Sequence, residues 1–176
     1  MIINENLLNR CLDDIIGKKY VFSAVLRVES GDGSFAWTGA RGDMESSDKY
    51  FIASVTKLYV TAVVMSLIEE RRISLDDKIS NYLPSSYMER LHVLNGVDYS
   101  DKITVGHLIS NTSGIPDYFF YKERGQKSAA TLFFEGSDVS WELEKTLQYV
   151  KKMKPLFAPG QKGKVAYSDS HNRLFL

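Results

Sequence analysis

The sequence predicts a mixed α+β fold in which helices and a strand hairpin occupy separate parts of the chain. An amphipathic helix comes first, a strand hairpin follows within residues 20–42, and the rest of the chain is mostly helical. Parallel α/β folds alternate strands and helices along the whole sequence instead. The order of elements therefore favours a mixed α+β fold, with a hairpin and a mostly helical region, over alternating βαβ units.

The N-terminal elements follow from residue periodicity. Apolar residues recur at helical spacing from Leu7 to Ile16, and Gly17 follows as a stop. Residues 20–29 alternate in polarity, and the turn SGDGS and the segment FAWTGARG predict the returning strand of a hairpin. We therefore expect a helix and strand hairpin in residues 1–53, followed by a mostly helical region in residues 54–176.

Four helices are expected after the hairpin. Nearly every residue from Leu58 to Ile68 is apolar, which predicts a helix that is buried on most sides. A second helix is predicted from Thr104 to about Asn111, because threonine is a favourable N-cap. A third is expected from Ser137 or Asp138 to about Lys154, and a fourth begins near Ser168.

Composition and charge exclude several classes of function. The 22 Lys and Arg residues balance 22 Asp and Glu residues, so the chain lacks the basic surface of nucleic-acid-binding proteins. The N-terminus has no apolar signal core, and no apolar run approaches the roughly 18 residues of a membrane span. We expect no nucleic-acid partner, no membrane span and a cytoplasmic location, or an extracytoplasmic one if a signal was removed. The single cysteine, Cys11, cannot form an internal disulfide.

A serine and a lysine stand in the first turn of the apolar helix. Side chains three residues apart share a helix face, so Ser54 and Lys57 are expected to be neighbours. Free N–H groups at a helix start stabilise an oxyanion, and burial favours a neutral lysine that can act as a general base. The alternative is that Ser54 caps the helix and Lys57 extends into solvent. The same spacing in the polar pair Ser46 and Lys49 is attributed to chance.

The triplet Tyr167-Ser168-Asp169 precedes the last apolar stretch. A tyrosine there can share a proton with Lys57, and Asp169 can orient both side chains. The alternative is that Tyr167 is a packed core aromatic. The triplet Tyr99-Ser100-Asp101 has the same letters but lies in a polar stretch, where a turn is expected.

Three segments together resemble the serine β-lactamase and penicillin-binding-protein family, in the branch with class C β-lactamases, D-alanyl-D-alanine carboxypeptidases and related esterases. The first segment is FIASVTKLYVTAVVMSLIEERRISLDDKISNYLP. The second, ITVGHLISNTSGIPDY, is similar to the family pattern H-L-L-x-H-T-S-G-L-P. The third, FAPGQKGKVAYSDSHNRLFL, is similar to P-G-x-x-x-x-Y-S-[ND]. The resemblance spans roughly residues 20–176 and implies a β-lactamase/transpeptidase-like fold, in which an antiparallel sheet is flanked by helices and joined to a mostly helical subdomain. On this resemblance, residues 1–176 are one partial domain of that fold.

The resemblance implies a mechanism and a substrate class. Ser54 would attack a carbonyl carbon to form an acyl-enzyme, while Lys57 and Tyr167 move protons and Asp169 completes the catalytic group. No metal or organic cofactor is implied. The substrates of such proteins are D-alanyl peptides, β-lactams and small esters or amides. We expect a structural role for His107 and for the loop 111–118.

Two departures from the family qualify this reading. Asp169 stands where many relatives carry asparagine, which disfavours a specialised β-lactamase. Family members are about twice as long, and their second half carries an H-x-G or K-T-G strand and the remaining strands of the sheet. We therefore expect a fragment, or a chain completed by a dimer partner or a second polypeptide, with little or no turnover alone.

Other interpretations stay open at this point. The chain could be a non-catalytic, penicillin-binding-protein-like sensing or interaction module that keeps Ser54, or an unrelated α+β binding domain. The aromatic-rich insert between Tyr118 and Trp141 could line the active-site cleft or form a packed cap.

Overall fold

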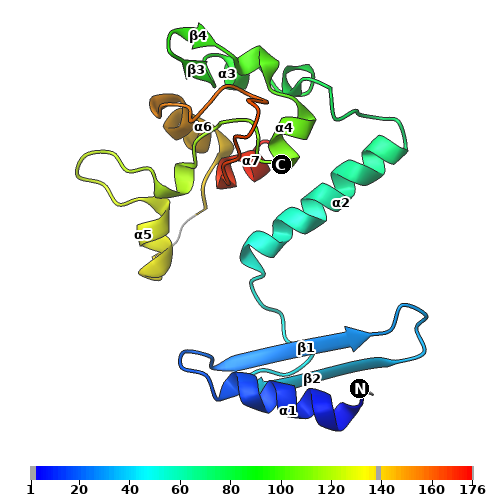
Figure 1. The fold of residues 1–176 in the computed structure, drawn as a ribbon. Coiled ribbons are helices and arrows are strands. Elements are labelled where there is room, and N and C mark those ends of the chain that lie inside the picture. Colours follow the sequence, from blue (N-terminus) through cyan, green and yellow to red (C-terminus); the bar gives the residue numbers. More distant parts are fainter. Residues whose placement is uncertain (1–2, 138–139, 176) are drawn as a thin grey trace. The chain divides into compact units, whose positions relative to one another are not determined.

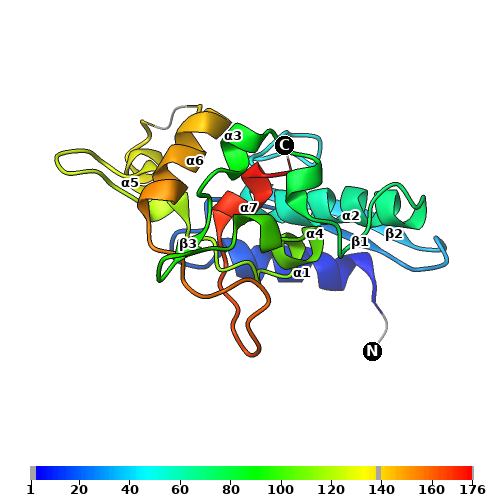
Figure 2. The same cartoon turned by 90° about the horizontal axis from the view of Figure 1, so that it is seen from above.

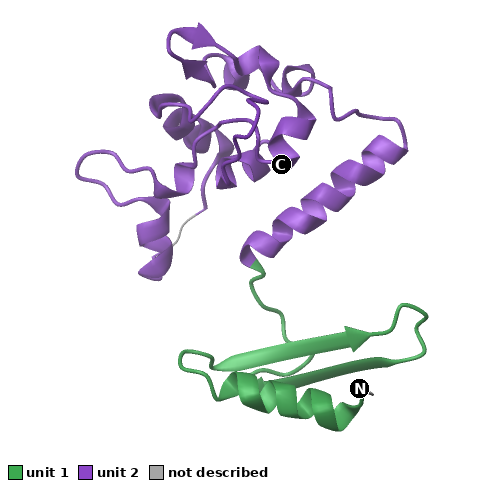
Figure 3. Ribbon diagram, viewed as in Figure 1, with its two compact units in different colours: residues 1–52 green, residues 53–176 purple. Residues whose placement is uncertain are grey.

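The chain forms two compact units in the computed structural model, which describes residues 3–137 and 140–175. The first unit comprises residues 1–52 and the second residues 53–176 (Figure 3). The first holds a helix and a hairpin, and the second holds the remaining helices and a short second hairpin (Figure 1). This mixture confirms the predicted α+β class.

The first unit packs one helix on a two-stranded sheet (Figures 1 and 2). Helix α1 (Glu5–Ile16) is capped by Asn4, and strands β1 (Ser23–Glu29) and β2 (Ala36–Gly42) pair antiparallel. The predicted strand begins three residues late because Tyr20 has a φ of 69°, which is left-handed and interrupts extended backbone.

The second unit is built mainly from short helices. In chain order its elements are η1 (Ala53–Val55), α2 (Thr56–Glu69), η2 (Ile79–Asn81), α3 (Ser85–Met88), β3 (Val93–Leu94), β4 (Val97–Asp98), η3 (Ser100–Lys102), α4 (Val105–Ile109), η4 (Tyr118–Phe120), α5 (Ala129–Phe134), α6 (Leu143–Lys152) and α7 (Asp169–Arg173). Its core is apolar and includes the fully buried Ile103 and Ile115.

The prediction that the apolar helix is buried on most sides was wrong. Among the residues of α2, all of which the structure describes, only Val64 is buried. Val60 and Ile68 pack against the same core, and these three residues lie on one face at a spacing of four. The apolar residues continue around the helix, but the second unit covers that single face. Other α2 side chains are therefore exposed, among them Leu58 at 70% and Tyr59 at 64%.

Two other predicted helices are present with shifted ends. Thr104 caps α4 through a capping box with His107, which confirms a structural role for that histidine. The helix expected from Ser137 or Asp138 begins only at Leu143, because the N–H of Ser137 instead closes the end of α5. Asp138 itself lies outside the described residues.

Candidate active site

Ser54 lies in the short turn η1, directly before α2. Its neighbour Ala53 has a φ of 46°, a left-handed conformation that costs an L-residue energy and is often found at functional sites. The side chain of Ser54 is solvent-accessible, and the N-cap of α2 is Val55. The position of the cap argues against the alternative in which Ser54 only caps the helix. A serine in this place can be reached by a substrate.

Lys57 is the second residue of α2 and lies one turn beyond Ser54. Its Nζ is 3.4 Å from the Ser54 Oγ, as the spacing of three residues predicted. Lys57 also continues the packed face of α2 formed by Val60 and Val64, because it precedes them at helical spacing. The packed stripe of the helix thus ends in an ammonium group beside the serine hydroxyl.

Tyr167 reaches the same point from the far end of the chain. Its Oη is 2.7 Å from the Ser54 Oγ, and its ring centroid lies 4.9 Å from the Lys57 Nζ, which is a cation–π distance. The side chain is half exposed, with 52% of its surface accessible. A packed core aromatic would be buried instead, so the structure favours the interpretation in which Tyr167 belongs to the site.

Asp169 completes the cluster by pairing with Lys57. The Lys57 Nζ donates to the Asp169 Oδ1, and the two side chains retain only 24% and 26% of their exposure. The Tyr167 hydroxyl donates to the same carboxylate oxygen over 3.3 Å. The four side chains predicted from the sequence therefore form one connected group.

The ion pair reverses the predicted charge behaviour of Lys57. Burial lowers the pKa of Lys57, but its hydrogen bonds with Asp169 and Tyr167 and the negative charge of Asp169 raise it, so the pKa lies above its ordinary value. The prediction of a neutral lysine was wrong because it considered burial without the carboxylate. Lys57 is an ammonium at neutral pH.

The hydrogen bonds assign the protons around Ser54. Tyr167 donates its hydroxyl proton to Asp169, so its oxygen is free to accept the proton of the Ser54 hydroxyl. The ammonium of Lys57 can only donate, and it points toward both Ser54 and Asp169. A continuous path therefore leads from the Ser54 hydroxyl through Tyr167 to the Asp169 carboxylate.

The segment 166–171 is held by the loop 111–118, which was predicted to be structural. The hydroxyls of Ser168 and Ser170 both donate to the carbonyl oxygen of Pro116, at 3.1 and 2.8 Å. Along this segment Tyr167 and Asp169 interact with the serine and lysine, while the alternating Ser168 and Ser170 interact with the loop. The loop thus fixes the direction in which the two site residues project.

Asp117 is a second carboxylate near the site that the sequence analysis missed. Its Oδ1 accepts the N–H of Phe119 at 3.0 Å. Burial raises the pKa of Asp117, and the nearby charge of Asp169 adds to this effect. The signal in the sequence was its position, directly after the Gly-Ile-Pro turn of the predicted structural loop.

The two sequence decoys lie in other surroundings. Ser46 and Lys49 occupy a polar stretch of the first unit with turn and irregular conformation. Residues 99–101 lead into η3, where Asp101 pairs with Lys78 and accepts from Ser80 on the surface. Neither matching motif contributes to the cluster around Ser54.

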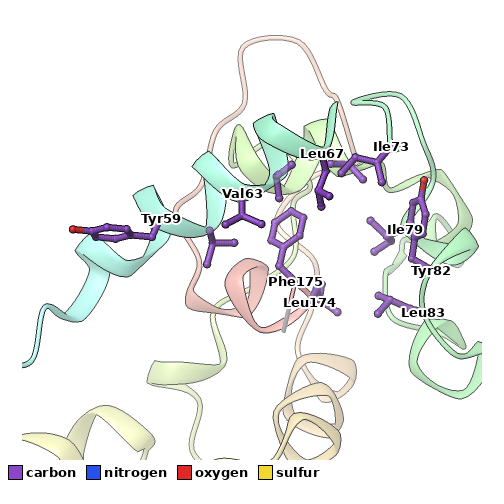
Figure 4. Close-up of a pocket in the computed structure, with 12 residues that line it drawn as sticks. Tyr59, Val63, Leu67, Ile73, Ile79, Tyr82, Leu83, Leu174 and Phe175 are labelled. Carbon is purple, nitrogen blue, oxygen red and sulfur yellow. The ribbon is translucent and has the colours of Figure 1, made fainter. Parts of the chain in front are cut away.

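A cavity of about 590 Å³ lies beside α2 and is lined mostly by apolar side chains. Val63 and Leu67 of α2 face Leu174 and Phe175 across it, and Ile79 closes one end (Figure 4). The four site residues are not among the described residues that line it. We therefore treat this cavity as separate from the chemistry at Ser54.

The aromatic insert after Asp117 packs in part against the helical core. Tyr118 is buried, and the Trp141 ring lies between Tyr118 and Tyr149, with centroids 6.2 and 5.8 Å away. Phe120 and Phe134 are exposed at 67% and 79%. The insert therefore combines a packed part with an accessible aromatic edge.

Residues 3–137 and 140–175 contain neither a metal-binding cluster nor a membrane-spanning helix. In this part of the chain no group of three or more His, Cys, Asp or Glu side chains is arranged to hold a metal ion. No helix there is both long and apolar enough to cross a membrane.

Comparison with known proteins places this geometry in a family. A family model described as Beta-lactamase matches residues 16–175. Penicillin-binding protein 4* of Bacillus subtilis (strain 168) is 30% identical over 115 residues, which cover 61% of this chain and 23% of that protein. Protein flp of Staphylococcus aureus is 37% identical over 68 residues, which cover 39% of this chain and 12% of that protein.

Solved structures agree with the family match. A D-stereospecific amidohydrolase from Streptomyces sp. superposes with a TM-score of 0.73 at 26% identity, covering 98% of this chain and 48% of that one. EstCE1, a hydrolase with promiscuous acyltransferase activity, has a TM-score of 0.65 at 22% identity and shares the fold. The chain thus spans about half the length of these structures and less than a quarter of the Bacillus protein. Because the family match covers nearly the whole sequence, the chain belongs to the Beta-lactamase family of serine β-lactamases and penicillin-binding-protein-like hydrolases.

Proposed function

We propose that this chain carries the acylation machinery of a serine hydrolase, with Ser54 as the nucleophile. The observation that carries the proposal is the contact between the Ser54 Oγ and the Tyr167 Oη, beside the Lys57–Asp169 ion pair. A nucleophilic hydroxyl needs an adjacent group that takes its proton and a further group that orients this base. The cluster around Ser54 has both.

In the proposed acylation step, the Ser54 oxygen forms a bond to the carbonyl carbon of an ester, amide or β-lactam. The Ser54 proton passes to Tyr167 while the Tyr167 proton passes to Asp169, so the phenol never carries a full negative charge. Lys57 remains an ammonium and stabilises the charge that develops around the serine oxygen. The protons return along the same path to the leaving group, and water later releases the acyl group.

The substrates we propose are D-alanyl peptides, other small amides and esters of D-amino acids, and β-lactams. The amidohydrolase that superposes at 26% identity is named as D-stereospecific, and the Bacillus relative as a penicillin-binding protein. The presence of Asp169 supports a hydrolase of amides and esters over a specialised β-lactamase, since many β-lactamase relatives carry asparagine at this position.

Completion by further polypeptide is part of this proposal. The second unit leaves apolar side chains of α2 exposed, and the sheet of the first unit has two strands. Exposed strand edges and large apolar surfaces favour association with another chain. We propose a dimer partner or a second polypeptide that covers these surfaces, and light scattering of the purified chain, alone and mixed with a candidate partner, tests this.

The function is tested by incubating the protein with a fluorescent penicillin and with an alkyl fluorophosphonate. A hydrolase forms an adduct with both and releases the penicilloyl group over time. A stable penicilloyl adduct supports the second candidate, a penicillin-binding-protein-like sensing module. If neither the chain alone nor its mixture with a candidate partner forms an adduct with either reagent, both functions are refuted.

A further inference from the structure

The loop 111–118 and the helix α7 meet at a buried histidine that the proposed mechanism does not use. His171 is 4% exposed, and both of its ring nitrogens are engaged. Its Nδ1 is 2.9 Å from the Asn111 Oδ1, and its Nε2 is 2.7 Å from the Ser113 Oγ. These contacts join α7, which carries Asp169, to the first residues of the loop 111–118 that follows α4.

The partners of His171 determine which nitrogen carries the proton. An amide oxygen can only accept, so the Nδ1–H of His171 donates to Asn111. The Ser113 oxygen accepts the N–H of Ile115 at 3.0 Å, which leaves its hydroxyl proton to be donated to the Nε2 of His171. A neutral ring with the proton on Nδ1 satisfies both contacts, whereas a doubly protonated ring would have to donate to the Ser113 oxygen and would leave the Ser113 hydroxyl proton without this acceptor.

Asn111 connects this histidine to the catalytic tyrosine. Asn111 is held in a left-handed conformation with a φ of 57°, and its carbonyl oxygen accepts the N–H of Ala166 at 2.9 Å. Ala166 directly precedes Tyr167 in the chain. The side chain of Asn111 is therefore fixed by His171 while its backbone fixes the residue before Tyr167.

From this geometry we propose that His171 is a positioning residue, which as a neutral Nδ1–H imidazole holds Asn111 and thereby sets Tyr167 and Asp169 against Ser54. This inference rests on the proposed function, because it assigns a role in presenting Tyr167 to the nucleophile. The burial that lowers the pKa of His171 to about 4 keeps the ring neutral under ordinary conditions, and the charge of Lys57 acts in the same direction.

The family pattern suggests a reciprocal test. In the pattern H-L-L-x-H-T-S-G-L-P the second histidine falls on the position of Asn111, and in this chain the residue at that position contacts a histidine. If the position of Tyr167 depends on the contact between residues 111 and 171, exchanging Asn111 and His171 should preserve that contact and the position of Tyr167. The variants are His171→Asn, Asn111→His and the double exchange, with Asn172→Ala on α7 as the control.

The readout is the rate of Ser54 labelling by an alkyl fluorophosphonate. We expect each single exchange to slow labelling about tenfold or more, since a misplacement of about 1 Å can cost 10²-fold. The double exchange is expected to return to within about threefold of the unaltered protein, because coupled residues are not additive. Equal labelling by all variants, or a double exchange as slow as the single ones, overturns the proposal.

Nitrogen-15 NMR of the full chain gives a readout that does not depend on reactivity. At pH 7 His171 is expected to show a protonated Nδ1 and an unprotonated Nε2. The substitution Ser113→Ala, which removes only the hydroxyl next to Nε2, should alter the Nε2 signal. The carbon-13 ring signals of Tyr167 should shift in His171→Asn and recover in the double exchange. A protonated Nε2, or Tyr167 signals unaffected by His171→Asn, contradicts the positioning role. Unreactive Ser54 together with the expected signals refutes the proposed function instead.

Discussion

Replacing Asp169 with asparagine separates the charge of the carboxylate from its shape. The Asp169→Asn side chain is isosteric and still accepts a hydrogen bond, but it removes the negative charge from the Lys57 ammonium and the proton acceptor from Tyr167. It also restores the residue that many family members carry. The variant therefore asks what the carboxylate contributes in this chain.

The expected loss of stability follows from the burial of the pair. Hydrogen bonds to charged groups contribute roughly 1.5–3 kcal/mol, and exposed ion pairs about 0–1 kcal/mol. Because Lys57 and Asp169 are 24% and 26% exposed, we place the loss between these cases, at about 1–2 kcal/mol. A chain of this length should then melt about 2–8 °C lower.

The pH dependence of this loss has a defined sign. The pKa of Lys57 is raised in the folded state, so the ion pair stabilises the fold below the unfolded-state pKa and stops contributing as the pH rises through the folded-state pKa. The difference in unfolding free energy between the protein and Asp169→Asn should therefore be largest near neutral pH. It should vanish in strong alkali, where Lys57 loses its charge.

The rate of Ser54 labelling should fall as well. General acid–base groups contribute about 10²–10⁴-fold, and the 3.3 Å Tyr167–Asp169 distance favours the lower end, so we expect a loss of about 100-fold. Urea denaturation and fluorophosphonate labelling are run in parallel, with Asp101→Asn as the control from the matching triplet. Unchanged labelling in Asp169→Asn, or an equal loss in Asp101→Asn, would refute the relay through the carboxylate.

Three further predictions concern single side chains. Tyr167→Phe keeps the ring over Lys57 but loses the hydroxyl, so Ser54 labelling should slow by about 10²–10⁴-fold with little change in urea midpoint. Burial lowers the pKa of His171 from 6.5 to about 4, with Lys57 and Asp169 as its charged neighbours. Between pH 7 and 4 the protein should therefore lose about 3 kcal/mol more unfolding free energy than His171→Asn; equal losses would contradict this. Leu12→Ala removes a fully buried side chain of the first unit, which should cost about 3 kcal/mol, seen as faster hydrogen exchange in β1 and β2.

The elements with strong local signals could be predicted from the sequence. Helix α1 ends where Gly17 follows its apolar stripe, and the hairpin of β1 and β2 follows its alternating residues and its Ser-Gly-Asp-Gly-Ser turn. The cluster of Ser54, Lys57, Tyr167 and Asp169 could also be predicted, because the spacing of the motifs constrains which side chains meet.

Other features depended on tertiary contacts or on a signal that was overlooked. The β3–β4 hairpin surrounds Asn95 and Gly96, whose positive φ angles are typical of a hairpin turn, so the Asn-Gly pair could have predicted it. The charge of Lys57 could not be predicted from burial alone, because it depends on a carboxylate 112 residues away in the sequence. The exposure of α2 depends on which of its faces the second unit covers, and its uniformly apolar sequence carries no information on that choice.

The proposed mechanism depends most directly on which serine reacts. After treatment with an alkyl fluorophosphonate, peptide mass spectrometry should locate the adduct on Ser54. Labelling should disappear in Ser54→Ala and Lys57→Ala and persist in Ser46→Ala, the serine of the second matching motif. An adduct on another serine, or labelling that survives Ser54→Ala unchanged, would contradict the assignment of Ser54 as the nucleophile.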